Sequence, residues 1–517
     1  MFTDQPYLRP AYHVVLGSFA IALLSAFVYT ALWYLDFGEI PGAPSPITLI
    51  QMASTADTVQ NLSEVTVAVL GIAITVVAII VELAANRYTP RITELFIKDP
   101  VNGLVLSFFS VTAVLVLLTA MSIGGVAYPK AMVTGVIIAM VLSLVMLLPY
   151  FLYVFEFLTP TSIITRIEYR GIQSIRDAAR TKTANITVLR TEAQNSVEQL
   201  GDIALNSLGK KEKAIAITAL NGLADLAVAS MFAKEKLPLN WFTTHQLAVI
   251  DRDFVALHPS MSQAIEHRKT WYEMKILRQF QSVFGEAAND MRDCAHMVTI
   301  HTRNIAVQAA EMKQEHTMRL AVRFMNTFLR TSINKRDVRT AYNLFNEYRA
   351  LAEAVMLAGE HELTEEIAER FKFYGQIAFS SALPFILEIA AYDLCTLLER
   401  AHETQSPAHE KLLTIFLDVD REPDGESGQE ASLRGVRKAQ VKLATYYLIK
   451  DEKELARRIF EDMRRELPDR LRGIRGELAS IVEPEWWEVS DRGINFDYLE
   501  PNRREKLNDF FAWFPNL

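Results

Sequence analysis

The fold of this chain is decided first by the segment VTVAVLGIAITVVAIIVEL (65–83), in which the only ionisable residue is Glu82. About 20 apolar residues in a helix span the hydrocarbon core of a bilayer, and a soluble core helix rarely stays apolar on every face for so long. Three similar segments lie at about residues 12–35, 101–123 and 131–155. We therefore predict an all-α protein with four transmembrane helices, in a membrane domain of residues 1–160, followed by a large helical cytoplasmic domain.

The composition separates into two parts. The 517 residues include 53 Lys and Arg against 61 Asp and Glu, a net charge of −8, and the mean hydropathy is +0.12. Only five of the basic residues lie among the first 155 positions, so the rest of the chain has the composition of a soluble domain. Two cysteines form no disulfide framework or zinc cluster within one chain, and the acidic balance argues against a nucleic-acid partner.

Positive charge marks one side of the predicted membrane domain. The connection between the first two apolar segments has no Lys or Arg, and the connection after the third has only Lys130. The connection after the second contains Arg87, Arg91 and Lys98, and four arginines follow the fourth segment. Because short cytoplasmic loops carry an excess of Lys and Arg, we expect both termini in the cytoplasm. Aromatic residues near the segment ends, such as Tyr153, fit a belt at the membrane surface.

Few polar residues lie inside the second segment. Thr75 and Glu82 are seven positions apart and therefore share one helix face, near Gly71 and Ala78, while Thr66 is displaced by about half a turn. Small residues let a second helix approach closely. Two interpretations remain open for Glu82: a carboxylate at the membrane surface paired with a following arginine, or a residue that lines a pore or cavity.

The stretch that follows changes character abruptly. Pro90 disfavours helix at Thr89, which predicts a helix end there and a new start with Thr89 as its N-cap. Arg87, Tyr88, Thr89, Pro90 and Arg91 then form a motif at the membrane interface. Residues 91–98 carry apolar side chains on one side, which predicts a short amphipathic helix lying in the interface.

The run TVVAIIVELAANRYTPRITELFIKDP (75–100) resembles the signature of a bacterial family of predicted membrane proteins, domain of unknown function 2254. The matching residues are Leu83, Ala84, Tyr88, Thr89, Pro90, Arg91, Phe96 and Asp99, with Thr75 in place of a serine. The chain departs from the signature at Val77, Glu82 and Arg87, where the family has Thr, Gln and Gln.

A second, looser similarity to this family lies in FLRTSINKRDVRTAYN (328–343), at Arg330, Asp337, Thr340 and Ala341. The resemblance implies a multi-pass protein of the bacterial inner membrane. It implies no established activity and supplies no catalytic residues.

The cytoplasmic part has helical periodicity throughout. We expect an irregular all-α domain over residues 161–420, in which the stretch 260–330 forms two helices that meet near residues 285–289. A flexible loop over 421–432 and a helical hairpin region over 433–483 follow. The tail 484–517 is rich in aromatic residues, so it either packs on its own domain or docks on a neighbouring subunit, a partner protein or the membrane.

No sequence motif indicates catalysis. The chain contains no GxxxxGK[ST], HExxH or GxSxG motif, and no glycine-rich dinucleotide fingerprint. Cys294, His296 and His301 are close in sequence, but their spacing on one helix does not converge on a metal. We therefore expect no enzyme, no cofactor and no metal.

Two functions remain as hypotheses. The preferred one is an oligomeric channel or pore-like protein with a cytoplasmic regulatory domain, in which Thr66, Thr75 and Glu82 line a path on the axis of a homo-oligomer. The alternative is a membrane-anchored scaffold or regulatory subunit that binds a partner protein through its helical domain or its aromatic tail.

Overall fold

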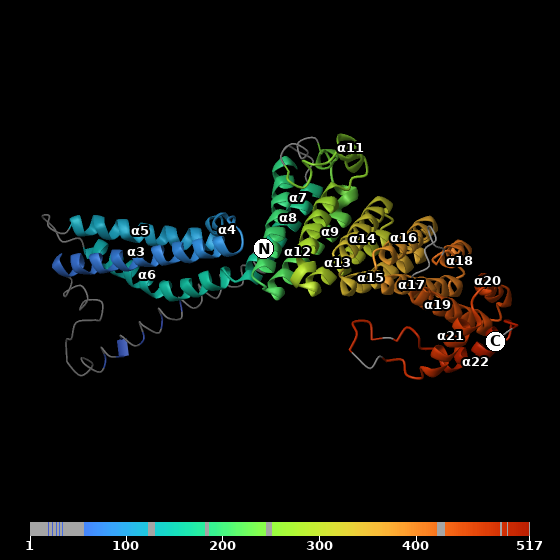
Figure 1. The fold of residues 1–517 in the computed structure, drawn as a ribbon. Helices are drawn as coiled ribbons and strands as arrows, with labels where there is room; N and C mark the ends of the chain where they lie inside the picture. The colour runs from blue at the N-terminus through green and yellow to red at the C-terminus, as the bar shows by residue number, and fades with distance from the viewer. Residues whose placement is uncertain are drawn as a thin grey trace. The chain divides into compact units, whose positions relative to one another are not determined.

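The computed structural model describes residues 56–122, 130–180, 186–244, 251–420, 430–485, 489–493, 495–515 and 517, with six single positions between 19 and 34. Its regular elements are helices, and no strand occurs in these residues. The chain divides into two compact units, unit 1 (Met1–Tyr169) and unit 2 (Arg170–Leu517). The predicted all-α fold is therefore confirmed for the described residues (Figure 1).

Unit 1 contains three long apolar helices, α3 (Ala56–Arg87), α5 (Pro100–Ser122) and α6 (Lys130–Phe157), and the short α4 (Ile92–Ile97). Each long helix is long and apolar enough to cross a membrane, which agrees with the predicted segments 65–83, 101–123 and 131–155. The predicted first segment, 12–35, lies almost entirely outside the described residues.

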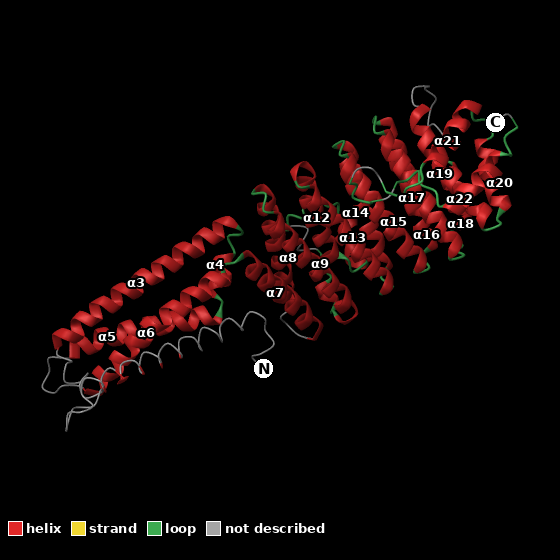
Figure 2. Ribbon diagram, turned by 90° about the horizontal axis from the view of Figure 1, so that it is seen from below, coloured by secondary structure: helices red, strands yellow, loops and turns green. Residues whose placement is uncertain are grey.

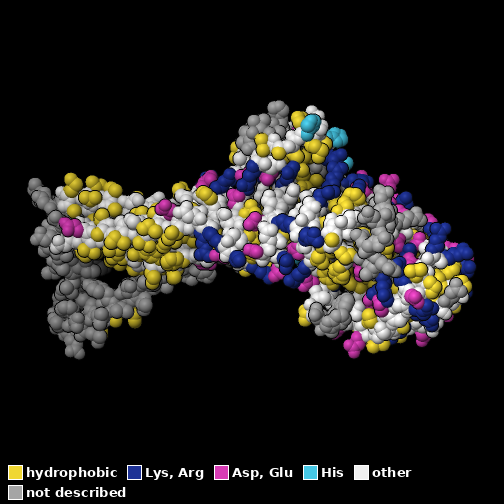
Figure 3. Space-filling model, in the orientation of Figure 1, with side chains coloured by type: hydrophobic (Ala, Val, Ile, Leu, Met, Phe, Trp, Pro, Cys, Tyr) yellow, Lys and Arg dark blue, Asp and Glu magenta, His cyan; other side chains and the backbone are white. Residues whose placement is uncertain are grey.

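The long helices of unit 1 carry most of their apolar side chains outward. Leu83, Leu104 and Leu148 are each more than 60% exposed, and hydrophobic side chains gather on the face of this unit that Figure 3 shows. So large an apolar surface is unfavourable in water, at about 25 cal/mol per Å². A bilayer removes this cost, which agrees with a membrane protein.

One face of α3 packs on the other helices of unit 1. Its buried residues recur at spacings of three and four, from Thr66 through Leu70, Ala73, Val77 and Val81. These spacings place them on one side of a helix, toward α5 and α6. The opposite side of α3 is left exposed.

Unit 2 begins within α7 (Pro160–Arg180) and is a stack of antiparallel helices (Figure 2). The next helices are α8 (Ile186–Gly209), α9 (Lys213–Ala233), α11 (Pro259–His267), α12 (Trp271–Asp290), α13 (Arg292–Glu311), α14 (Glu315–Asn334) and α15 (Val338–Leu357). They are followed by α16 (His361–Ser380), α17 (Pro384–Glu403), α18 (His409–Leu417), α19 (Glu430–Ile449), α20 (Lys453–Met463), α21 (Pro468–Ser480) and α22 (Pro501–Phe511).

The middle of unit 2 has two layers. Helices α13, α15, α17 and α19 pack side by side in one layer, and α12, α14, α16 and α18 form the other. Consecutive helices therefore alternate between the layers, as in helical-repeat proteins.

The array has a period of 23 residues. Helices α13 to α17 begin at residues 292, 315, 338, 361 and 384, and α19 and α20 begin at 430 and 453. The turns repeat with the same period, because Lys313, Arg336, Gly359, Ala382 and Gln405 all have positive φ. After each of them, the next amide donates to a carbonyl five residues earlier, as Gln314 does to Ala309 at 2.8 Å.

This regularity corrects two expectations. The domain is a tandem array rather than an irregular one, and residues 259–334 form four helices, α11 to α14, rather than two. The expected junction near 285–289 lies inside α12, which ends at Asp290. The turns were missed because four of the five positions with positive φ are not glycine, the residue that usually marks such a turn.

Helix α9 is also apolar and long enough to qualify as a membrane span by length and composition, over Lys213–Lys236. However, 56% of its apolar window is buried, against 28% or less in α3, α5 and α6. It packs on α8, α12 and α13, so its apolar residues are accounted for by the interior of unit 2.

The C-terminal region folds back on unit 2. Helix α22 packs on α19 and α21, and Phe510, Phe511 and Phe514 are buried. Most of the predicted loop 421–432 lies outside the described residues, and α19 begins within it, at Glu430.

Candidate functional site

The predicted pore or packing residues of α3 occupy two different faces. Thr66 is 3% exposed and belongs to the face that packs within unit 1. Gly71, Thr75, Ala78 and Glu82 lie on the exposed face, where the Thr75 hydroxyl donates to the Gly71 carbonyl at 2.9 Å. The structure therefore separates Thr66 from the other four.

The predicted interface motif is partly buried. Tyr88 and Thr89 are 6% and 1% exposed, whereas Arg87 and Pro90 are exposed and Arg91 is half-buried. The Arg87 guanidinium lies 5.2 Å from the centre of the Tyr88 ring. Tyr88 and Thr89, in the middle of the motif, are thus buried in protein, whereas its first residue, Arg87, is exposed.

Two details of the next helix differ from expectation. Its N-cap is Arg91 rather than Thr89, because the Thr89 carbonyl and not its hydroxyl receives the amide of Ile92. The apolar side of α4 does point one way, as predicted, but its residues are buried in protein. Phe96, for example, meets the Phe157 ring edge-on at 5.6 Å between ring centres.

Directly after α4, Asp99 organises a buried polar cluster in unit 1. Its Oδ1 accepts the amides of Val101 and Asn102, at 3.0 and 3.3 Å, and so caps the first turn of α5. The same oxygen accepts the Tyr153 hydroxyl at 2.7 Å, and Oδ2 accepts Nη1 of Arg166 at 2.8 Å. Tyr153 is therefore a buried structural residue and not part of a surface belt.

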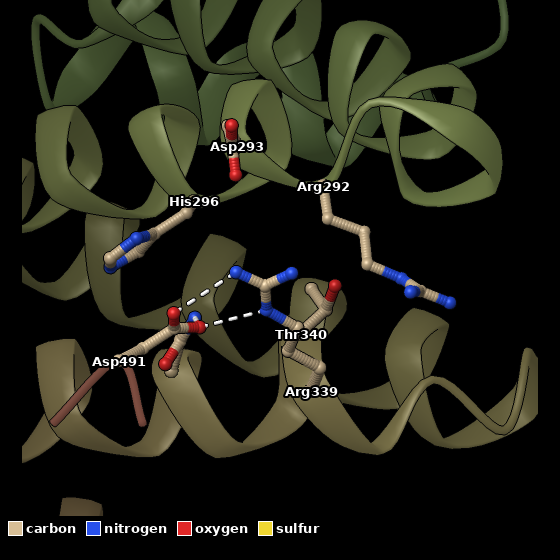
Figure 4. Close-up of a pocket in the computed structure, with 7 residues that line it drawn as sticks. Arg292, Asp293, His296, Arg339, Thr340 and Asp491 are labelled. Carbon is tan, nitrogen blue, oxygen red and sulfur yellow. Dashed lines mark hydrogen bonds and ion pairs between the residues drawn. The ribbon is translucent and has the colours of Figure 1, made fainter. Parts of the chain in front are cut away.

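Unit 2 carries a second polar site, along the layer of α15, α17 and α19. It is crossed by an irregular segment that we call the strap, residues 489–499, of which 494 is not described. Asp491 of the strap accepts Nε and Nη2 of Arg339, at 2.8 and 3.0 Å, and Nδ2 of Asn343 at 2.8 Å (Figure 4). The hydrogen bonds from Arg339 and Asn343 lower the pKa of Asp491 to about 2.

The next residue of the strap makes the reverse pairing. Nη1 and Nη2 of Arg492 donate to the two carboxylate oxygens of Asp393 in α17, at 2.9 and 3.0 Å. The guanidinium also lies 4.3 Å from the centre of the Tyr342 ring. Both charged side chains are less than 10% exposed, so this ion pair is shielded from water.

The second half of the strap is held by aromatic and main-chain contacts. The Phe496 ring stacks on Tyr392 at 5.0 Å between ring centres. Asp497 accepts the Tyr392 hydroxyl at 2.5 Å and Nζ of Lys438 at 2.6 Å. Lys442 donates to the carbonyls of Phe496 and Tyr498. Three successive helices of one layer therefore bind one extended segment.

A cavity of about 250 Å³ lies next to Asp491, between α13 and α15. Figure 4 shows Asp293 and His296 reaching it from α13, and Arg339 and Thr340 from α15. Three of the seven lining residues, Arg339, Thr340 and Asn343, come from the second stretch that resembled the family.

The Cys294, His296 and His301 side chains do not converge. Cys294 is fully buried, His296 meets Glu347 at 3.3 Å, and His301 meets Asn221 at 2.9 Å. Burial lowers the pKa of His301 to about 4. Within the described residues, no group of three His, Cys, Asp or Glu side chains is placed to hold a metal.

The sequence indicated Arg166 only as one of the four arginines that mark the cytoplasmic side, and it indicated the strap only as part of the aromatic tail 484–517. Asp99 was available as a signature residue, but its partners lie 54 and 67 positions away, beyond any local pattern. The strap residues and their partners are 54 to 152 positions apart.

The apolar surface of unit 1 and the helical array of unit 2 define an all-helical membrane protein. Residues 9–207 match the model of a family described as predicted membrane protein (DUF2254), which confirms the resemblance stated above. The match extends through unit 1 into α8, and the second similar stretch, 328–343, lies outside it. No curated protein matches the chain.

The chain is similar to a solved structure described as a circular tandem repeat protein with novel repeat topology and enhanced subunit contact surfaces. The similarity covers 80% of this chain and 85% of that one, with 12% sequence identity and a TM-score of 0.36.

Proposed function

We propose that the chain is a membrane-anchored scaffold or regulatory subunit that binds a partner protein through unit 2. The 23-residue helical array is the observation that carries this proposal. In such arrays equivalent positions of successive helices line up into a long surface, whose shape suits an extended partner. Every helix from α13 to α17 contributes to one of the two layers.

The proposal places the protein in the inner membrane of a bacterium, with both termini and unit 2 on the cytoplasmic side. It is supported by the arginines and lysines that cluster after the second and fourth apolar segments. The proposal assigns the chain no enzymatic activity, no cofactor and no nucleic-acid partner. This part of the proposal is supported by the lack of catalytic motifs in the sequence and by its net negative charge.

Site-specific photo-crosslinking of the full chain in its native membrane tests the scaffold. A photoreactive residue is placed at Leu357 or Phe373, exposed apolar positions of α15 and α16, and as a matched control at Ile72 or Ile79, exposed positions of α3. We expect one defined foreign protein to be crosslinked from unit 2 and not from α3. Crosslinks only to lipid or to the chain itself would reject the scaffold.

A second candidate function, an oligomeric channel, is favoured by the exposed face of α3. Gly71, Thr75, Ala78 and Glu82 share this face, and in a homo-oligomer they could line an axis between protomers. Conductance of the full chain in liposomes tests this function. We expect Glu82→Gln to alter ion selectivity and Thr75→Leu to reduce conductance; a conductance unchanged by both removes α3 as a pore lining.

A further inference from the structure

We propose that the surface of α15, α17 and α19 beneath the strap is the partner-binding site of this scaffold, and that it takes an extended peptide segment carrying an acid–arginine pair. The strap is the internal ligand of this site. The inference rests on the proposed scaffold function and names the chemistry of the partner.

The site has one binding position for a carboxylate and another for an arginine, and we call these two positions sockets. Arg339 and Asn343 donate three hydrogen bonds to one carboxylate. The planar guanidinium of Arg339 matches the geometry of a carboxylate. Asp393, which is 3% exposed, offers both oxygens to one guanidinium, with the Tyr342 ring beneath it. The opposite charges of these sockets, on neighbouring helices, set the order and direction of the bound segment.

The contacts further along are those of peptide recognition. Lys442 binds main-chain carbonyls, which any sequence provides, and the Tyr392 ring takes an aromatic side chain. The site thus combines sequence-independent contacts with a small number of specific ones. All the residues of α15, α17 and α19 that contact the strap are distant from it in sequence.

The end of the strap that carries Asp491 is the end that a partner would displace first. Asp491 is exposed, Val489 is fully exposed, and the cavity beside Asp491 is lined on its other side by α13. The surface therefore continues past the strap, beside His296, and a partner segment gains contacts there that the strap does not make. Such contacts are needed, since a ligand in the same chain acts at an effective concentration of the order of mM.

A labelled peptide with the strap sequence VSDRGINFDYL (489–499) tests the proposal by fluorescence anisotropy against the full chain in nanodiscs. Arg492→Met in the chain weakens the strap and leaves the surface unchanged. We expect the peptide to bind this variant about tenfold more tightly than the wild-type chain, because the weakened strap competes less for the site. We also expect Asp393→Asn, added to Arg492→Met, to abolish the gain.

The matched control is the same peptide with its acid and arginine replaced, Asp491→Asn and Arg492→Met, which should not bind either chain. Equal affinity for the wild-type and Arg492→Met chains, or binding that survives Asp393→Asn, overturns the proposal. If Arg492→Met abolishes cooperative unfolding of unit 2, the strap belongs to the core, which also overturns it. A defined photo-crosslinked partner together with no peptide binding would leave the scaffold standing and place its site elsewhere.

Discussion

Arg166 and Asp99 form an ion pair in the interior of unit 1, with Nη1 of Arg166 donating to Oδ2 of Asp99 at 2.8 Å. The two side chains are 10% and 3% exposed. Because Asp99 also caps α5 and accepts the Tyr153 hydroxyl, one carboxylate joins the starts of two helices to the end of α6. The signature residue Asp99 therefore has a structural role that its position in the sequence does not reveal.

Asp99→Ala should destabilise unit 1 strongly. It removes the cap of α5 and leaves the Arg166 guanidinium without its buried carboxylate, a change that typically costs about 3–5 kcal/mol. Thermal unfolding of the full chain in detergent measures the effect. Glu94→Gln is the matched control, since it breaks the exposed pair of Glu94 and Lys98, which is worth about 0–1 kcal/mol. Equal effects of the two substitutions would contradict the role assigned to Asp99.

Gly171→Ala should destabilise the packing of α7 on α8 and α9. An added Cβ would lie 2.6 Å from Cδ2 of Leu226 and 2.9 Å from Cβ of Ser196, and overpacking of this kind costs about 1–3 kcal/mol. Gly285→Ala in α12 meets no atom within 4 Å and should instead stabilise by about 0.5–1 kcal/mol. Chemical denaturation of both variants checks the difference in sign, and a common sign would refute the packing argument.

Ala382→Gly should stabilise the turn between α16 and α17. Ala382 has φ of 58°, which costs a residue with a Cβ about 1 kcal/mol relative to glycine. Ala358, the C-cap of α15, has φ of −75°, so Ala358→Gly should destabilise by a similar amount. The midpoints of thermal unfolding report both changes. A loss of stability in the Ala382→Gly chain would show that the turn is not strained.

Glu388→Gln should make the chain more stable at alkaline pH and leave it nearly unchanged at pH 4. Burial raises the pKa of Glu388 to about 7; the nearby Lys438 ammonium opposes this rise, and repulsion from Asp497 and Glu477 adds to it. The folded state then holds a proton that the unfolded state releases near pH 4.5, so wild-type stability falls as pH rises from about 4.5 to 7.

Unfolding midpoints between pH 4 and 8 measure this dependence on Glu388. Glu362→Gln, at an exposed position of α16, is the control and should leave the pH profile unchanged. Identical profiles for the Glu388→Gln and wild-type chains would contradict the expected protonation of Glu388.

The helices of the membrane domain could largely be predicted from the sequence, because the property that defines a membrane span involves only neighbouring residues. A span needs about 20 consecutive apolar residues, and α3, α5 and α6 supply them in uninterrupted runs. The apolar side of α4 was visible for the same reason, since residues three and four apart share a helix face. What local spacing did not decide was whether that side met lipid or protein.

The candidate site was predicted poorly for a physical reason. The strap and its sockets pair charges that are distant in the chain, such as Asp491 with Arg339 and Arg492 with Asp393. Each residue alone resembles an ordinary surface charge. Only the fold brings the opposite charges together and removes enough water to make their pairing specific.

The sequence by itself determined that the chain is all-helical, that its first part is a membrane domain and that this domain resembles a known family. Tertiary structure decided the rest: the 23-residue array, the cluster at Asp99 and the segment bound across α15, α17 and α19. Hydrophobic length and helical periodicity act over neighbouring residues and are visible in a single chain. Packing repeats whose turns mostly lack glycine, and ion pairs between distant residues, become visible only when the helices have stacked.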